Sequence, residues 1–186
     1  MFVLTDGPKY NYTLVSQAHG PQYIDELLKI IQIYNLIENN LRKNLIFRLN
    51  LKNFGWNIKD KIEKTDPKIR FDKEINFYKS ISNKKLLIFN YNGTSFLEAL
   101  SLNIPSIIIL DENIWQIRES EQKYFNLLKE VKILYTNQKD ISNFINKSFN
   151  DIDKWWNCRA LQHNIRTFCT RFIKYDEKLL NKIISK

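Results

Sequence analysis

The chain has 186 residues, a length that suits a domain with a sizeable buried core. Hydrophobic residues make up 44% of it and aromatic residues 13%, which excludes an intrinsically disordered protein. A net charge of +9 is typical of proteins that bind nucleic acid, but the lysines are dispersed and mixed with acidic residues. Because nucleic-acid binding needs clustered cations, we expect none here.

In chain order, hydrophobic periodicity predicts strands that alternate with helices. These elements are a strand at 2–5, a helix at 22–39, a strand at 45–49, a helix at 58–64, a strand at 69–71, a helix at 73–80, a strand at 86–89, a short helix from 94, a strand at 106–110, a helix at 119–129, a strand at 131–135 and helices at 139–149, 153–173 and 176–184. Strands separated by helices at this spacing predict an α/β fold with a Rossmann-like, doubly wound parallel sheet. We expect one domain over residues 1–186, with a helical C-terminal extension from about residue 139.

The apolar runs and the cysteines indicate the cellular setting. The longest apolar runs have the length of strands, and Asp6-Gly7-Pro8 interrupts the region where a signal peptide would need an apolar core. Cys158 and Cys169 lie on one predicted helix, too far apart along its axis to form a disulfide. We therefore expect a cytoplasmic protein whose positive charge favours contact with the cytoplasmic face of an anionic membrane.

Residues 86–110 carry the clearest functional pattern. A buried strand stops before Asn90, a turn at Asn92-Gly93 follows, and a helix begins at Thr94 or Ser95. This order places a helix N-terminus at the carboxyl end of a parallel strand, where open α/β sheets bind phosphates. We expect a positive φ at Gly93 and a cap from Thr94 or Ser95, with free N–H groups facing an anion. A purely structural turn is the alternative, because the glycine content falls short of a P-loop.

Charged and polar residues at other strand ends extend the expected site. Arg48 and Asn50 end the strand at 45–49, and Arg118 lies in the loop after the strand at 106–110. Either arginine could neutralise a diphosphate and stabilise a departing nucleotide without a metal. The alternative for both arginines is a surface ion pair.

His19 lies in the loop after the first strand, just before the helix at 22–39. A positive helix end favours a neutral imidazole, which could act as a base or donate to an oxyanion. His19 and Arg48 are therefore the candidate catalytic residues, although a loop histidine can also be structural. No Cys/His/Asp cluster has metal-ligand spacing, so we expect no metal.

Two motifs resemble the C-terminal, donor-binding half of GT-B glycosyltransferases and their sugar-nucleotide epimerase relatives. They are NGTSFLEAL at residues 92–100 and LNIPSI at residues 102–107. More narrowly, the whole chain is similar to a family of bacterial surface-carbohydrate transferases. The similar features are Ser16–Gln22, Arg48, Gly55-Trp56, Tyr91–Glu98, the loop from Trp115 to Arg118, Tyr124-Phe125, Trp155–Asn157, Arg166 and Phe168-Cys169.

The resemblance implies a fold equivalent to the C-terminal domain of a GT-B protein and a nucleotide sugar as the donor substrate, with no further cofactor. Glu98 matches a residue that binds ribose hydroxyls in relatives. The expected donor-binding residues are then Asn50, Asn92, Gly93, Thr94, Ser95, Glu98 and Arg118. The N-terminal, acceptor-side domain of such proteins is absent, so we expect a separate N-terminal-half protein or self-association to complete the enzyme.

The function that these features favour is transfer of a sugar from a nucleotide to a surface-polysaccharide acceptor. A sugar-nucleotide 2-epimerase is an alternative, although it would need carboxylates and a histidine around the sugar. A non-catalytic module that binds a nucleotide or a glycan is the second alternative.

Overall fold

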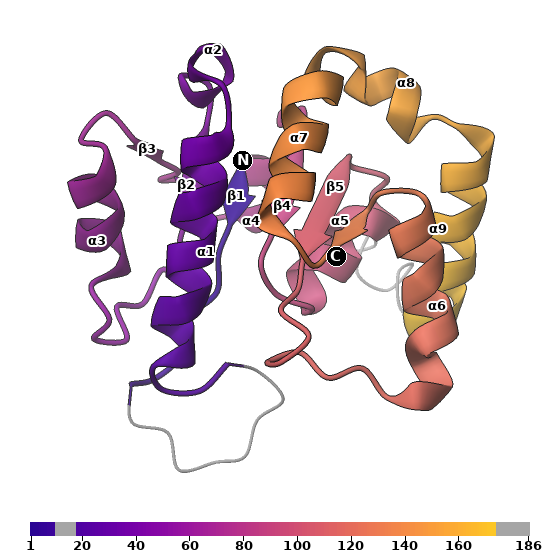
Figure 1. Ribbon diagram of the computed structural model, residues 1–186, viewed down its shortest axis with the longest axis horizontal. Helices are drawn as coiled ribbons and strands as arrows, with labels where there is room; N and C mark the ends of the chain where they lie inside the picture. Colours follow the sequence, from indigo (N-terminus) through magenta and orange to yellow (C-terminus); the bar gives the residue numbers. More distant parts are fainter. Residues whose placement is uncertain (10–17, 174–186) are drawn as a thin grey trace, which may run out of the picture.

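Six short parallel strands form the centre of the structure, a computed structural model that describes residues 1–9 and 18–173 (Figure 1). The strands are β1 (Phe2–Val3), β2 (Ile46–Arg48), β3 (Arg70–Phe71), β4 (Leu87–Phe89), β5 (Ser106–Ile109) and β6 (Leu134–Tyr135). The helices are α1 (Gln22–Leu36), α2 (Asn39–Arg42), α3 (Ile58–Thr65), α4 (Phe77–Ile81), α5 (Thr94–Ser101), α6 (Glu119–Glu130), α7 (Gln138–Ser148), the 3-10 turn η1 (Phe149–Asp151), α8 (Ile152–Trp156) and α9 (Arg159–Phe172).

The strand order is β3-β2-β1-β4-β5-β6, and every neighbouring pair is parallel. The chain builds the sheet outward from β1 through β2 and β3, and then returns to build β4, β5 and β6 on the other side. This order confirms the predicted doubly wound, Rossmann-like sheet. Val3 pairs with both Arg48 and Phe89, so the residues that follow these three positions meet at one carboxyl edge.

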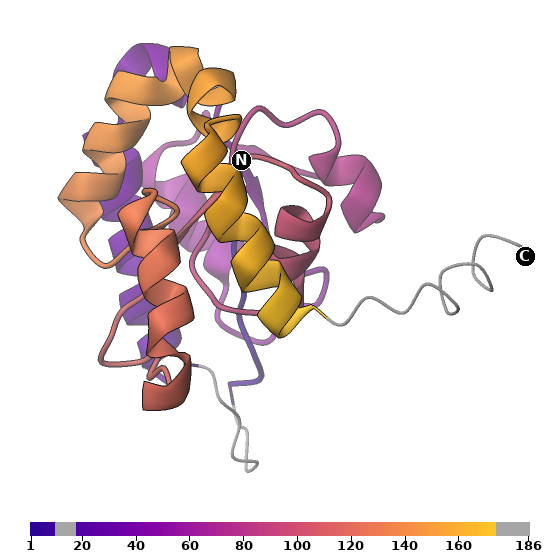
Figure 2. The ribbon, with the colours of Figure 1, turned by 90° about the vertical axis from the view of Figure 1, so that its right-hand side faces the viewer.

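Helices cover both faces of the sheet because successive strand residues point to opposite sides. Phe2, Phe47 and Ile88 face a cluster that includes residues of α1, α3 and α7. Val3 and Phe89 face a second cluster that includes residues of α4, α5, α6 and α9. Figure 2 shows the sheet between these layers, with α7 packed beside α1 and α9 beside α6.

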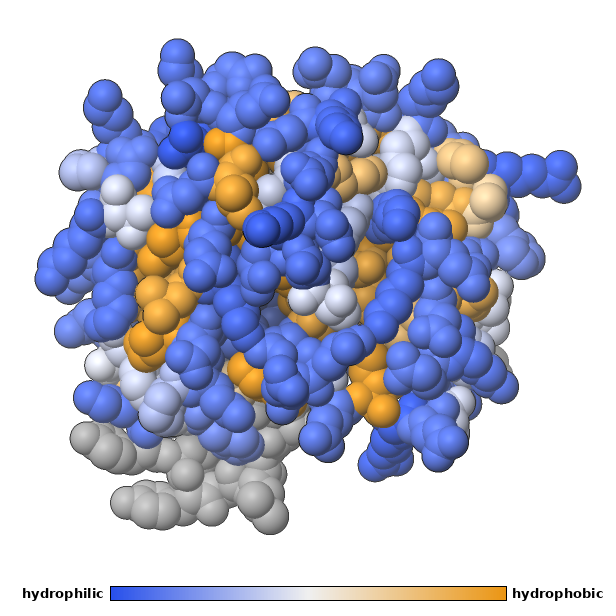
Figure 3. All heavy atoms as spheres, viewed as in Figure 1, coloured by the Kyte–Doolittle hydropathy of each residue, from blue (hydrophilic) through white to orange (hydrophobic). Residues whose placement is uncertain are grey.

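The surface is polar, in keeping with the high charge of the chain. On the face shown in Figure 3, hydrophobic residues form narrow strips between hydrophilic ones. None of the helices in the described residues is long and apolar enough to cross a membrane.

The helix predicted at 73–80 begins later, at Phe77. The carbonyl oxygens of Glu74 and Ile75 accept hydrogen bonds from the Arg48 guanidinium. Asn76 then caps the helix, because its side chain accepts from the Lys79 N–H at 3.1 Å. A side chain from β2 therefore keeps residues 74 and 75 out of the helix.

The single helix predicted at 153–173 is divided into α8 and α9. Cys158 has an extended backbone, with ψ at 132°, and interrupts the helical geometry. The interruption lies next to Trp156, whose indole N–H donates to the Asn103 side chain and carbonyl. Both cysteines are free, as expected, but only Cys169 lies within a helix. The helix predicted at 176–184 lies outside the described residues.

Phe168→Ala should destabilise the second cluster strongly. The Phe168 ring is fully buried and contacts the rings of Phe96, Phe125 and Phe172. Removing a buried phenyl ring costs about 3–5 kcal/mol through lost transfer energy and the cavity left behind. Urea denaturation should show this loss, whereas Arg166→Ala on the exposed side of α9 should change stability by less than about 0.5 kcal/mol. Equal effects of the two substitutions would contradict the packing described here.

Candidate functional site

The carboxyl edge between β1 and β4 is the point where the strand order reverses. Because α1 follows β1 on one face and α5 follows β4 on the other, the loops at this point diverge and leave a crevice. The buried Asn90 side chain spans it. Asn90 Oδ1 accepts from the Thr5 N–H at 3.3 Å, and Asn90 Nδ2 donates to Glu26 Oε2 at 3.4 Å. One amide therefore joins the end of β1, the end of β4 and helix α1.

The turn after β4 presents the N-terminus of α5. Gly93 is the N-cap residue, and no side chain caps this helix end. The N–H groups of Thr94 and Ser95 find no acceptor among the described residues, because the first bonds to the Gly93 carbonyl come from Phe96 and Leu97. Free N–H groups at a helix N-terminus favour an anion. The free N–H groups expected at this helix end are present, but the prediction that Thr94 or Ser95 caps the helix was wrong.

Glycine is needed at position 93 for a steric reason. Its φ of −139° is extended, so the predicted positive φ was wrong. A Cβ at this position would lie 2.8 Å from two ring carbons of Tyr91, closer than real Cβ contacts allow. The missing side chain therefore lets the Tyr91 ring pack against the turn.

Tyr91 brings several predicted residues together. Burial raises the pKa of the Tyr91 phenol, which also responds to Ser95, Glu98 and Arg48. The Ser95 and Arg48 side chains lower this pKa, and the Glu98 carboxylate raises it. Arg48 from β2 and the turn after β4 thus lie within electrostatic reach of one tyrosine.

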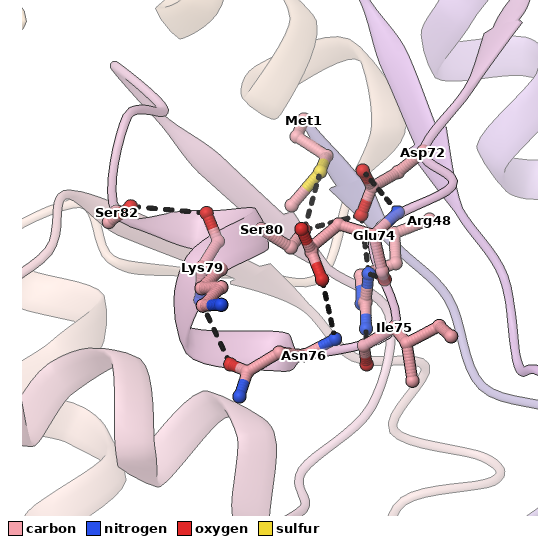
Figure 4. Close-up of polar contacts among 9 residues, drawn as sticks. All are labelled: Met1, Arg48, Asp72, Glu74, Ile75, Asn76, Lys79, Ser80 and Ser82. Atoms are coloured by element: carbon pink, nitrogen blue, oxygen red, sulfur yellow. Dashed lines mark hydrogen bonds and ion pairs between the residues drawn. The ribbon is translucent and has the colours of Figure 1, made fainter.

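Arg48 is also held firmly within the protein (Figure 4). Its guanidinium pairs with Asp72 and donates to the carbonyl oxygens of Glu74 and Ile75, at 2.6 and 3.2 Å. The Ser80 hydroxyl donates to the same carboxylate. Burial raises the pKa of Asp72, but the bonds from Ser80 and Arg48 lower it more, so the pKa lies below its ordinary value. The alternative for Arg48 was a surface ion pair; an ion pair is present, but it is largely buried.

Asn50 lines a groove of about 390 Å³ at the carboxyl ends of β1, β2 and β3. Its side chain accepts from the Lys52 N–H at 3.2 Å. Asp6 after β1 and Asp72 after β3 line the same groove. The groove therefore combines these polar groups with apolar side chains such as Leu51 and Phe71, and it lies on the β2 side of the reversal point.

His19 and Arg118 lie on other elements around the crevice. The His19 backbone N–H donates to the Gln22 side-chain oxygen at 2.8 Å, just before α1. Arg118 is exposed at the start of α6, and its guanidinium makes no hydrogen bond or ion pair with the described residues. Asn92 and Thr94 are exposed on the turn, and Glu98 is half-buried one turn further along α5.

Buried polar atoms without a partner gather at this edge of the sheet. Among the described residues the affected atoms are Asp6 Oδ1, Tyr23 Oη, Arg42 Nε, Trp115 Nε1 and Tyr135 Oη. All except Arg42 belong to strand ends, to the loops that follow them or to the first turn of α1. Each such atom costs about 1–3 kcal/mol, and native structures tolerate the cost where a ligand or water can satisfy it.

Glu26 is a buried carboxyl group in the crevice with a strongly raised pKa. Burial raises its pKa to about 7, although Trp115, Lys29 and Asn90 lower it in part. The Trp115 indole N–H lowers the pKa of this carboxyl but makes no hydrogen bond with it. Lys29 pairs with Asp111, and both line a cavity of about 60 Å³ beside Glu26 and Asn90. The described residues contain no group of three or more side chains arranged to hold a metal.

Sequence reasoning missed Asp6, Glu26, Tyr91 and Asp72 as parts of this edge. A polar residue directly after an apolar strand was the signal for Asp6 and Asp72. Glu26 gave no such signal, because an acidic residue in the first turns of a helix is ordinarily exposed.

Asp72→Asn should destabilise the protein at neutral pH. The substitution leaves the Arg48 guanidinium buried without its partner, and such a loss costs about 3–5 kcal/mol. Because the Asp72 pKa is lowered in the folded state, its contribution is present above the unfolded pKa near 4 and is lost as the pH falls through the folded value. In urea denaturation, the free energy of unfolding of the variant should therefore fall less than that of the wild type as the pH is lowered from 7 to 3.

The exposed Asp60, which lines the same groove, supplies a control. Asp60→Asn should change stability by less than about 0.5 kcal/mol. The ion pair would have no structural role if Asp72→Asn behaved in the same way.

Glu26→Gln should stabilise the protein at pH 8. A carboxyl whose pKa rises to about 7 on folding keeps its proton in the folded state, so stability falls as the pH rises from the unfolded value through pH 7. The loss is on the order of 3 kcal/mol for this buried group. Glutamine keeps the acceptor for Asn90 and cannot ionise, so thermal melts should show a flatter pH profile between pH 5 and pH 8. Glu130→Gln, on the exposed end of α6, should keep the wild-type profile.

Comparisons with known proteins give one family. No curated protein and no solved structure matches the chain. Residues 1–186 match the model of a family described as LIC12162 family transferase. The match spans every element that builds the crevice, from β1 to α9. The chain therefore belongs to the LIC12162 family of transferases.

Proposed function

We propose that the chain binds a nucleotide-activated sugar at the carboxyl edge of its sheet and takes part in passing the sugar to a surface-polysaccharide acceptor. The observation that carries this proposal is the uncapped N-terminus of α5 at the point where the strand order reverses. Open α/β sheets bind nucleotides at this point. Membership of a transferase family supports a group-transfer reaction.

The phosphates of the donor would lie at the turn after β4. The free N–H groups of Thr94 and Ser95 and the positive end of α5 suit a diphosphate, and both side chains add hydroxyl donors. Asn92 and Gly93 shape the same turn. The half-buried Glu98 lies one turn further along the helix, where its carboxylate can accept ribose hydroxyls.

Charge at the crevice would stabilise the departing nucleotide. Arg48 lies within electrostatic reach of Tyr91 and the turn, although Asp72 neutralises part of its charge. Arg118 is exposed and so can move toward a phosphate. His19 remains the candidate base, and Asn50 a candidate for contacts with the donor. These groups supply electrostatic stabilisation without a metal.

The acceptor side of the reaction requires a surface outside this crevice. We propose that a second protein or a second copy of the chain supplies it. The net charge of +9 favours a cytoplasmic location in contact with the anionic inner face of the membrane.

Nucleotides should stabilise the purified chain against heat. A ligand at one hundred times its dissociation constant adds about 2.7 kcal/mol to the free energy of unfolding. A thermal-shift panel of UDP, GDP, dTDP, CDP and CMP should therefore contain at least one stabilising nucleotide. Glu98→Gln and Ser95→Ala should each weaken its binding in calorimetry by about tenfold or more, because bonds to charged groups contribute about 1.5–3 kcal/mol.

Two substitutions serve as controls for this titration. Ser101→Ala changes the other end of α5, where the hydroxyl donates to the Glu98 carbonyl at 2.8 Å. Glu130→Gln removes an exposed charge from α6. Both variants should bind as the wild type does. No stabilisation by any nucleotide, together with stabilisation by single-stranded DNA, would instead support a nucleic-acid function.

A further inference from the structure

The groove of about 390 Å³ at the carboxyl ends of β1, β2 and β3 lies at the same edge of the sheet as the α5 turn. Its volume is within the range of small-molecule sites. The loops that follow these strands build it, together with the N-terminus of α3, which begins at Ile58. Residues 92–95 of the α5 turn do not line it. The groove can therefore hold a part of a ligand that the turn does not hold.

Apolar side chains form one part of the groove lining. Leu49, Ile58 and Phe71 are partly buried and pack against the cluster that includes residues of α1, α3 and α7. Leu51 lines the same groove and is 68% exposed. The Lys59 ammonium lies over the Phe71 ring at 5.6 Å, so a ligand meets Leu51 and Ile58 before the face of that ring. An apolar surface inside a concave site favours an apolar face of a ligand.

Asparagine amides line the groove as well. The Asn50 side-chain oxygen accepts from the Lys52 N–H at 3.2 Å, and the Asn53 side-chain oxygen accepts from the Gly55 N–H at 2.9 Å. Because backbone N–H groups hold these oxygens, the NH₂ groups of both amides stay available as donors. The Asn57 side chain does not cap α3 and makes no hydrogen bond within the described residues, so its donor and its acceptor are both available.

The charges that line the groove are balanced. Three lysines and three aspartates contribute to the lining, and they are Lys52, Lys59, Lys73, Asp6, Asp60 and Asp72. An anion therefore gains little in the groove, whereas the N-terminus of α5 favours one. A neutral part of a ligand suits the groove best.

The register of the sheet fixes the distance between the groove and the α5 turn. Val3 pairs with both Arg48 and Phe89, so β2, β1 and β4 end at one level. The groove lies at the end of β2, and the α5 turn follows β4. Adjacent strands are about 4.8 Å apart, so the ends of β2 and β4 are about 10 Å apart. An extended nucleoside diphosphate spans this distance between its base and its second phosphate.

We propose that the groove binds the base of the donor nucleotide while the diphosphate lies at the α5 turn. A base is neutral and planar, with apolar faces and an edge that carries hydrogen-bond donors and acceptors. Leu51 and Ile58 contact its face, and the amides of Asn50, Asn53 and Asn57 bond to its edge. This assignment rests on the proposed function, because it takes the phosphates to lie at α5.

Two variants remove groove contacts without disturbing the fold. Asn57 has a φ of 50°, which glycine adopts readily, so Asn57→Gly should keep the wild-type melting temperature. Leu51→Ser changes an exposed side chain and should keep it too. The matched controls are Lys132→Gly, at a φ of 63°, and Leu102→Ser, at a leucine that is 50% exposed. Both control residues lie at the opposite, amino edge of the sheet, before β6 and β5.

Calorimetry of the whole chain with UDP, CDP and GDP tests the base site, because these ligands differ only in the base. The wild type should prefer one of them by about fivefold or more. Asn57→Gly should reduce that preference by about threefold, since one hydrogen bond is lost. Leu51→Ser should weaken all three ligands by about threefold through lost apolar contact. The two controls should bind as the wild type does.

Pyrophosphate, which has no base, separates this site from the phosphate site. Leu51→Ser and Asn57→Gly should bind pyrophosphate as tightly as the wild type, whereas Ser95→Ala should bind it more weakly. Uridine, cytidine and guanosine are the complementary probes, because they carry a base and no phosphate. Both groove variants should weaken the preferred nucleoside.

Other outcomes overturn the base site. Equal wild-type affinities for UDP, CDP and GDP would overturn it and leave the proposed phosphate site standing. Affinities and a base preference that both groove variants leave unchanged would place the base elsewhere. Nucleosides that bind and are weakened by both variants, with no binding of pyrophosphate, would support the base site and contradict the phosphate site at α5. No binding of any nucleotide, nucleoside or pyrophosphate would overturn both.

Discussion

A single buried amide connects the parts of the crevice. The chain leaves β1 toward one face of the sheet and leaves β4 toward the other, so the loops at this edge would separate without a link between them. The Asn90 side chain provides that link through the Thr5 N–H and the Glu26 carboxyl. The end of β1, the Glu26 side chain on α1 and the start of the Asn92-Gly93 turn are joined through it. Because an unsatisfied buried amide is costly, these bonds hold the edge in one arrangement.

Several features of the carboxyl edge of the sheet lower the stability of the fold. The α5 N-terminus lacks a cap, where a serine or threonine would contribute about 1 kcal/mol. Glu26 is buried at a cost that grows as the pH rises, and Asp6, Tyr23, Trp115 and Tyr135 each bury a polar atom without a partner. Local rules of protein stability are broken most often at functional sites. The dense aromatic packing around Phe168, whose ring contacts Phe96 in the first turn of α5, offsets such costs.

The order and type of the elements follow from the sequence, because strand and helix periods differ and the helices carry clear start signals. The element boundaries that were predicted wrongly depend on contacts between residues that are far apart in the sequence. Residues 74 and 75 stay out of α4 because Arg48, on another strand, binds their carbonyl oxygens. The position of the turn after β4 was predictable, but the reason for Gly93 was not, since the Tyr91 ring fills the space of a Cβ only in the folded chain. Glu26, Asp6 and Tyr23 join the edge through burial, which no local pattern reports.

The central claim is that a nucleotide binds at the free N–H groups of α5. Two-dimensional NMR of the ¹⁵N-labelled chain, titrated with UDP, GDP, dTDP, CDP and CMP, tests it most directly. The account predicts that the largest amide shifts occur at Thr94 and Ser95, with slower hydrogen exchange at both and smaller changes in the Trp115 indole signal. Shifts confined to the exposed side of α9 around Arg166, with Thr94 and Ser95 unchanged, would contradict it.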